Sequence, residues 1–241
     1  MDIQVYFSAV EAESAQVGQG TAVVIDVVRA TSVMVEALAN GARAIYPTQA
    51  TEDAIRLATS MGREDTLLCG ERRGLKVEGF DLGNSPGEFT PARVKGKRLV
   101  MTTTNGTRAL LAANGAHRIV VAAFLNLAAV ARAVAEDDGP LAVVCAGKEG
   151  HFALDDAVCA GQFIQEVKAL RSSKVSLGDG AMAALALAES QPVSGEFLGR
   201  TAAGKALQEV GLDGDLPYCA RRDLHDLVPE MHDRVIALPG G

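Results

Sequence analysis

The sequence has no tryptophan, and aromatic residues make up only 4% of its 241 residues. A surface that stacks nucleic-acid bases needs aromatic side chains, so we do not expect nucleic acid as a partner. The chain also lacks a run of basic residues, and its formal net charge is -7. This acidic balance argues against binding to a phosphate backbone or to an anionic membrane surface.

Cysteine motifs and long apolar segments are also absent. The four cysteines are widely spaced and form neither a C-x-x-C motif nor a Cys/His zinc pattern. We therefore expect reduced thiols in a cytoplasmic protein. The N-terminal residues show no basic segment followed by an apolar core, so we expect no signal peptide. No apolar run has the length of a membrane span.

The sequence does contain a repeated pattern of short β-branched runs, each followed by an Ala- and Leu-rich stretch. Residues 21–28, 97–103 and 117–124 are typical of buried strands, and the stretches that follow them are typical of helices. This alternation predicts a three-layer α/β/α fold with a largely parallel or mixed sheet. Because no linker or repeat marks a boundary, we expect residues 1–241 to form a single domain, with two close-packed lobes as the alternative.

Polar loops follow several of these strands, where ligands of parallel sheets bind. In the first loop, IDVVRATS, Asp26 ends a strand, and Thr31 or Ser32 can cap the next helix. The carboxylate can hold a divalent cation or act as a nucleophile, and Arg29 can bind an oxyanion. The alternative is a buried structural Asp–Arg pair.

The next two loops have different compositions. Residues 71–84 are rich in glycine and charge, which suggests either a solvated surface loop or a backbone that a ligand approaches closely. Residues 102–108, TTTNGTR, place three hydroxyls, an Asn and a Gly before a helix. That composition favours an oxyanion cradle, with a well-capped helix as the alternative.

The fourth loop, CAGKEGHFALDDAVCAG, contains Lys148 and the pair Asp155 and Asp156. One aspartate is expected to cap the helix, which leaves the other free as a metal ligand or base. His151 is expected to be structural or exposed, because no second histidine stands at a metal-ligand spacing. Residues 199–205 match a P-loop, but Ala206 lacks the necessary hydroxyl and no strand is predicted before them, so we reject that assignment.

Taken in order, the blocks IDVVRATS, CGERRG, VEGFDLGNSP, TTTNGTRAL and AGKEGHFALDDAVCAG resemble the ComB-type 2-phosphosulfolactate phosphatases over nearly the whole chain. The resemblance implies a Mg²⁺-dependent acid phosphatase with the α/β fold of that family. Such an enzyme hydrolyses 2-phospho-3-sulfolactate to 3-sulfolactate and phosphate, a step towards coenzyme M.

For this activity we assign catalytic roles to Asp26, Arg29 and Asp156. The expected Mg²⁺ ligands are Asp26 with Asp81 or Asp156, and either water or Asp26 attacks the phosphorus. The expected substrate-binding residues are Ser32, Arg72, Lys76, Thr103, Thr104, Asn105, Gly106 and Lys148. The alternatives are a phosphatase of another small phospho-acid and a non-catalytic protein that binds small anions. We expect a homodimer because it is the commonest oligomeric state, and no feature of the sequence points to it.

Overall fold

The computed structural model describes residues 1–15 and 17–240. The strands are β1 (Asp2–Tyr6), β2 (Thr21–Ile25), β3 (Ala44–Pro47), β4 (Thr66–Arg72), β5 (Leu75–Lys76), β6 (Arg98–Thr102), β7 (Arg118–Ala122), β8 (Leu141–Cys145), β9 (Ser176–Leu177), β10 (Glu230–His232) and β11 (Val235–Ala237). The α-helices are α1 (Ala9–Ala15), α2 (Ala30–Ala39), α3 (Thr51–Met61), α4 (Pro91–Val94), α5 (Gly106–Ala112), α6 (Leu127–Val134), α7 (Leu154–Leu170), α8 (Asp179–Ser190), α9 (Gly195–Arg200), α10 (Ala202–Glu209) and α11 (Leu216–Cys219). The 3₁₀ helices are η1 (Pro86–Glu88), η2 (Phe124–Asn126) and η3 (Asp213–Asp215).

Within the described residues the strands form one 11-stranded sheet, in the order β5-β4-β6-β3-β11-β10-β7-β2-β8-β1-β9. The sheet contains two parallel blocks, β4-β6-β3 and β7-β2-β8-β1-β9. The antiparallel hairpin β10–β11 lies between the blocks. The sheet is therefore mixed, and the predicted α/β fold is confirmed.

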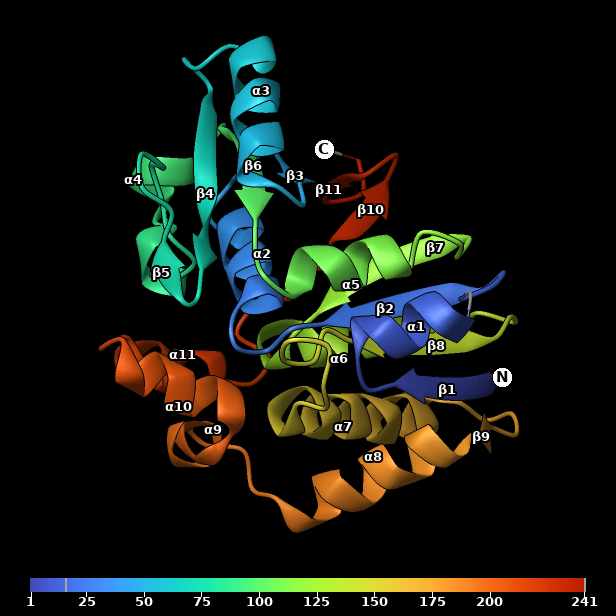
Figure 1. The fold of residues 1–241 in the computed structure, drawn as a ribbon. Coiled ribbons are helices and arrows are strands. Elements are labelled where there is room, and N and C mark those ends of the chain that lie inside the picture. The colour runs from blue at the N-terminus through green and yellow to red at the C-terminus, as the bar shows by residue number, and fades with distance from the viewer. Residues whose placement is uncertain (16, 241) are drawn as a thin grey trace.

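The hairpin joins each block through one residue pair, Glu230 with Val120 and Ile236 with Ile45. Figure 1 shows β4 and β6 upright, while β2, β8 and β1 run across the view. The sheet thus turns sharply at the hairpin, as accumulated strand twist permits. As a result, the carboxyl ends of strands in both blocks approach one corner of the molecule.

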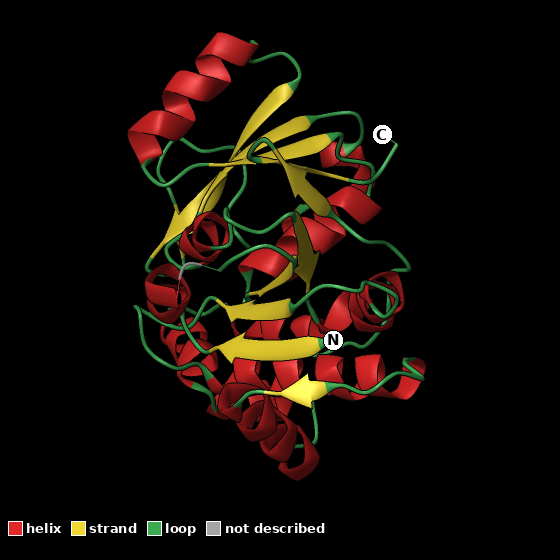
Figure 2. Ribbon diagram, turned by 90° about the vertical axis from the view of Figure 1, so that its right-hand side faces the viewer, coloured by secondary structure: helices red, strands yellow, loops and turns green. Residues whose placement is uncertain are grey.

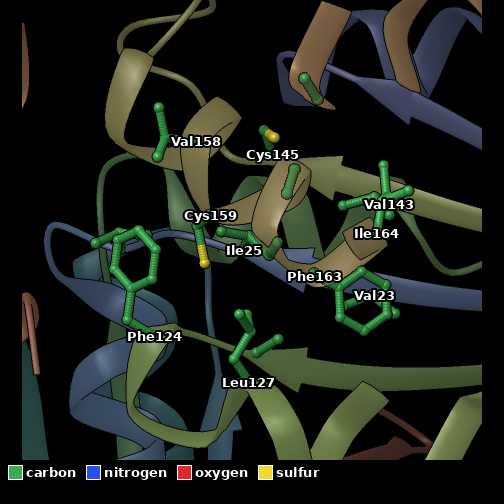
Figure 3. Close-up of a cluster of buried hydrophobic side chains, with 14 of the residues drawn as sticks. Val23, Ile25, Phe124, Leu127, Val143, Cys145, Val158, Cys159, Phe163 and Ile164 are labelled. Carbon is green, nitrogen blue, oxygen red and sulfur yellow. The ribbon is translucent and has the colours of Figure 1, made fainter. Parts of the chain in front are cut away.

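The fully buried strand β2 explains how the layers are held together. Its alternate residues Val23 and Ile25 belong to an apolar cluster with α6 and α7, which Figure 3 shows in close-up. Ala22 and Val24 face the other way and pack in a second cluster with α1, α2 and α5. Figure 2 shows helices on both sides of the strands. Burial on both faces is why this strand has a continuous apolar sequence.

All four cysteines are free and buried. Burial raises the pKa of each thiol, which keeps it protonated and unreactive. Among the described residues, no helix combines the length and the apolar character that crossing a membrane requires.

Candidate active site

A cavity of about 560 Å³ lies where loops from both sheet blocks meet α10. Residues after β2, β4, β6 and β8 line it, together with the start of α7 and one face of α10. This is the corner in Figure 1 where the ends of β2 and β6 approach the orange helices α9–α11. The lining side chains include the carboxylates Asp26, Glu71, Asp155 and Asp156 and the cations Arg29, Arg73, Lys148 and Lys205.

The loop after β2 places Asp26 at the cavity. The Oδ1 atom of Asp26 accepts a hydrogen bond of 3.1 Å from the backbone N–H of Ala30, the first residue of α2. The Thr31 hydroxyl donates to the Asp26 carbonyl, and the Ser32 hydroxyl donates to the Val27 carbonyl. The expectation that Thr31 or Ser32 caps the helix is therefore wrong. Ser32 is fully buried and does not line the cavity.

Arg29 lines the cavity, but its guanidinium group is already engaged by the protein. It donates to Ser85 Oγ at 2.9 Å, to Asp215 Oδ2 at 2.7 Å and to the Gly74 carbonyl at 2.7 Å. These three acceptors come from segments far apart in the sequence. Arg29 therefore forms a buried ion pair with Asp215 rather than with Asp26, and it joins three walls of the cavity.

Asp155 and Asp156 lie in the first turn of α7, yet neither provides the expected side-chain cap, because the capping residue is Ala153. Both oxygens of Asp156 are used: Oδ1 accepts from the Val27 N–H at 2.8 Å and Oδ2 from the Gly147 N–H at 3.0 Å. Asp156 thereby ties the β2 and β8 loops together. The Oδ1 atom of Asp155 is buried and has no hydrogen-bond partner among the described residues.

We call Asp26, Asp155 and Asp156 the floor of the cavity; their exposed fractions are 7%, 2% and 2%. Burial, with the charges of Asp155 and Glu71, raises the pKa of Asp26 to about 7. Burial raises the pKa of Asp155 to about 6. Burial and the charges of Asp155 and Asp26 raise the pKa of Asp156. Each negative charge on the floor is therefore disfavoured unless a cation accompanies it.

The loop after β6 brings Thr103, Thr104 and Asn105 to the cavity, as predicted. Part of its hydrogen-bonding capacity is already used, since the Thr104 N–H donates to Glu71 Oε1 at 2.7 Å. Gly106 packs directly behind the floor: a Cβ atom there would lie 2.8 Å from Asp26 Oδ2. A glycine is thus needed for the close approach of this loop to the carboxylate.

Besides Ser32 and Gly106, three further predicted site residues lie outside the cavity lining. Asp81 forms a salt bridge of 2.8 Å with Arg63 and accepts from the Leu68 N–H at 2.7 Å, so it supports β4. Arg72 donates to the Gln49 carbonyl and to Thr102 Oγ1, and Lys76 is exposed on β5. The tight turn after β4 instead presents Arg73 to the cavity.

The structure adds lining residues that were not selected from the sequence: Glu71, Arg73, Asn84, Asp155 and Lys205. The sequence leaves open which of Asp155 and Asp156 is the free carboxylate. Glu71 and Arg73 belong to the charged segment 71–84. Lys205 is the last residue of the P-loop-like stretch 199–205. This stretch begins at the end of helix α9 and not after a strand, so the rejection of a P-loop is confirmed. The place of Lys205 at the cavity depends on how α10 packs, and no sequence motif marks it.

We call Arg73, Lys148 and Lys205 the mouth of the cavity. Arg73 and Lys205 are exposed, and Lys148 is half-buried, 3.9 Å from Glu149. His151 is exposed, as expected. Within residues 1–15 and 17–240, no group of three or more His, Cys, Asp or Glu side chains is placed to hold a metal ion.

Comparison with known proteins identifies the family of this chain. A family model described as 2-phosphosulpholactate phosphatase matches residues 6–234. A protein of Clostridium acetobutylicum named "Probable 2-phosphosulfolactate phosphatase" is 40% identical, over 95% of this chain and 97% of its own. Proteins with the same name from Clostridium novyi and Thermotoga petrophila are each 39% identical, over 96% and 90% of this chain and 97% and 92% of theirs. The chain therefore belongs to the 2-phosphosulfolactate phosphatase family.

Proposed function

We propose that the chain is a Mg²⁺-dependent phosphatase that hydrolyses 2-phospho-3-sulfolactate to 3-sulfolactate and phosphate, a reaction of the coenzyme M biosynthesis type. The names of its relatives support the substrate, and their similarity extends over nearly the whole chain. The cavity supports the chemistry, because it combines buried carboxylates with a set of cationic side chains. Metal-assisted hydrolysis of an anionic ester uses both kinds of group.

The unpartnered Oδ1 atom of Asp155 is the observation that carries the Mg²⁺ proposal. A buried carboxylate oxygen without a donor is unfavourable, and here two further buried carboxylates line the same cavity. A divalent cation bound by Asp26 and Asp155 would offset part of this buried negative charge. Mg²⁺ commonly binds through one or two carboxylates together with water and substrate phosphate, so a full cage of protein ligands is not required.

Asp26 and Asp155 are the side chains we propose as Mg²⁺ ligands, with Asp156 holding the two loops in place. Asp155 thus replaces Asp81 and Asp156, the two alternatives that the sequence offers as the partner of Asp26. When bound, Mg²⁺ supplies positive charge that neutralises the phosphoryl oxygens of the substrate. Lys148 and the polar loop of Thr103 and Asn105 are positioned to bind the remaining phosphoryl oxygens, because they line the same cavity.

Asp26 has one oxygen available for chemistry. Its Oδ1 atom accepts from Ala30, whereas Oδ2 lies against Gly106. Asp26 can take a proton from the attacking water at Oδ2 and return it to the leaving oxygen. In the second route Oδ2 attacks phosphorus directly. Acid quenching during turnover separates the two, because only direct attack leaves phosphate on the peptide that contains Asp26.

Phosphate release from a panel of phosphorylated hydroxy acids, with and without Mg²⁺, tests the proposed function. We expect 2-phospho-3-sulfolactate to be hydrolysed with the highest kcat/KM, and EDTA to abolish turnover. Faster release from another phospho-acid would favour a phosphatase of different specificity. Binding of these ligands without any phosphate release would favour a small-anion binding protein, which has little use for three buried carboxylates.

A further inference from the structure

We propose that Arg73 and Lys205 form a subsite for the sulfonate of the substrate, which with the carboxylate is one of the two acidic groups that are not cleaved. The two side chains lie on different walls of the cavity, Arg73 on the turn between β4 and β5 and Lys205 on α10. This inference rests on the proposed function, because it assigns residues to the part of the substrate that sets specificity.

The charges that line the cavity indicate where the phosphate and the sulfonate of the substrate bind. The floor of the cavity holds buried carboxylates, so a second anion there would be repelled once the phosphate and its cation are bound. Arg73 and Lys205 offer the opposite charge in solvent, beside the exposed carboxylates Glu149 and Glu209, and a sulfonate there keeps part of its hydration. The phosphate is therefore favoured at the floor and the sulfonate at the mouth.

Other cations near the site already have protein partners. Arg29 is bound to Asp215, Arg72 to backbone and hydroxyl oxygens, and Lys148 lies near Glu149. Within the described part of the chain, Arg73 and Lys205 make no salt bridge, although both line the cavity. They are thus the cations available to a ligand at the mouth.

The turn that presents Arg73 is fixed from both sides. The N–H of Gly74 donates to Glu71 Oε2 at 2.8 Å, and its carbonyl accepts from Arg29 at 2.7 Å. The backbone of Arg73 itself is left-handed, with φ of 53°, as a tight turn requires. The exposed side chain of Arg73 therefore extends from a backbone that two cavity-lining residues hold.

The wall that presents Lys205 is equally well anchored. The Thr201 hydroxyl accepts from the Gly204 N–H at 3.1 Å and caps α10. A Cβ atom on Gly204 would lie 1.9 Å from the Leu198 carbonyl oxygen, so α9 and α10 pack with backbones in contact. A Cβ on Gly74 would meet Val210 at 3.5 Å, which shows that the turn and α10 touch. The two cations thus come from adjoining, ordered segments.

The two side chains suit a sulfonate in complementary ways. The planar guanidinium group of Arg73 can donate two parallel hydrogen bonds to sulfonate oxygens, and Lys205 adds a compact charge on a flexible stem. Glu209 lines the same wall one turn further along α10. Without the charge of Lys205, the carboxylate of Glu209 would be the charged group on that wall. Its negative charge should further weaken binding of an anion.

The test compares ligands with and without the sulfonate. In kinetic assays Arg73→Gln and Lys205→Gln should each lower kcat/KM for 2-phospho-3-sulfolactate about tenfold, mainly through KM. Turnover of 2-phospholactate, which lacks the sulfonate, should change less than about twofold. Lys76→Gln is the matched control, since Lys76 lies on the adjoining strand outside the cavity, and it should leave both substrates unaffected.

Calorimetric binding of 3-sulfolactate and of lactate, with Mg²⁺ present, gives a readout that does not need turnover. The wild-type chain should prefer 3-sulfolactate at least about tenfold, and the double variant should lose this preference. Loss of the preference in a chain that releases no phosphate would support the subsite and reject the proposed reaction. Retained preference, equal losses for both ligands, or no preference in the wild type would overturn the subsite even if the phosphatase activity is found.

Discussion

At the floor of the cavity three carboxylates are almost completely buried, whereas at its mouth Arg73 and Lys205 are exposed to solvent. The floor belongs mainly to the wider sheet block, since Asp26 follows β2 and Asp155 and Asp156 follow β8. The mouth combines Arg73 from the other block and Lys205 from the C-terminal helices with Lys148 from the loop after β8. Burial makes the charge on the floor unfavourable without a cation, whereas the charge at the mouth is hydrated and free to meet a ligand.

The largest effect is expected from removing the charge of Asp26 on the floor. Asp26→Asn should lower phosphate release about 10³-fold or more, because it removes both a metal ligand and the proton acceptor. The fold should persist, since the amide oxygen can still accept from Ala30. Asp81→Asn is the matched control and should keep activity within about twofold. Near-normal turnover by Asp26→Asn would reject its catalytic role.

The adjacent aspartates of α7 should respond differently to the same substitution. Asp155→Asn should weaken Mg²⁺ binding about 10- to 100-fold and leave stability unchanged or improved, because it removes a buried, unpartnered charge. Asp156→Asn should lower the free energy of unfolding by about 1–3 kcal/mol, because one of the two N–H donors loses its acceptor. Mg²⁺ titration calorimetry and urea unfolding measure the two quantities. The reverse pattern would exchange the roles that we give to these residues.

The buried carboxylates of the floor should also make stability depend on pH in the absence of divalent cations. The pKa values of Asp26 and Asp155 rise from 3.8 to about 7 and about 6 on folding. At pH 5 the folded chain therefore binds protons that the unfolded chain has released, and the free energy of unfolding falls as pH rises. The two shifts together correspond to a loss of about 4 kcal/mol between pH 5 and pH 8, measured by urea unfolding.

Two additions make this experiment specific to the floor. Millimolar Mg²⁺ should restore stability at pH 8, because it binds the folded state with its carboxylates ionised. Asp26→Asn should flatten the pH dependence, since it removes the group with the pKa of about 7. A stability that rises from pH 5 to pH 8 without Mg²⁺ would show that the floor carboxylates ionise without difficulty.

The sequence correctly identified residues that follow the ends of buried strands. Asp26, Thr103 and Lys148 each follow such a strand, and all three line the cavity. Strand periodicity identifies these positions, and the shared polarity of parallel strands brings them together. The charged segment 71–84 was a poorer guide: Arg72 and Lys76 were preferred, but Arg73 is presented by the turn. A turn has no period from which the direction of its side chains can be derived.

The sequence by itself determined the α/β architecture, the strand-end loops and the resemblance to this family, because these depend on local periodicity and on contiguous motifs. Only the tertiary structure decided which charges meet. The hairpin β10–β11 turns one sheet block against the other, and that turn brings Glu71 and Arg73 to the same cavity as Asp26. The packing of α10 adds Lys205 from more than a hundred residues away. Such long-range contacts depend on how the layers pack, and no local pattern records them.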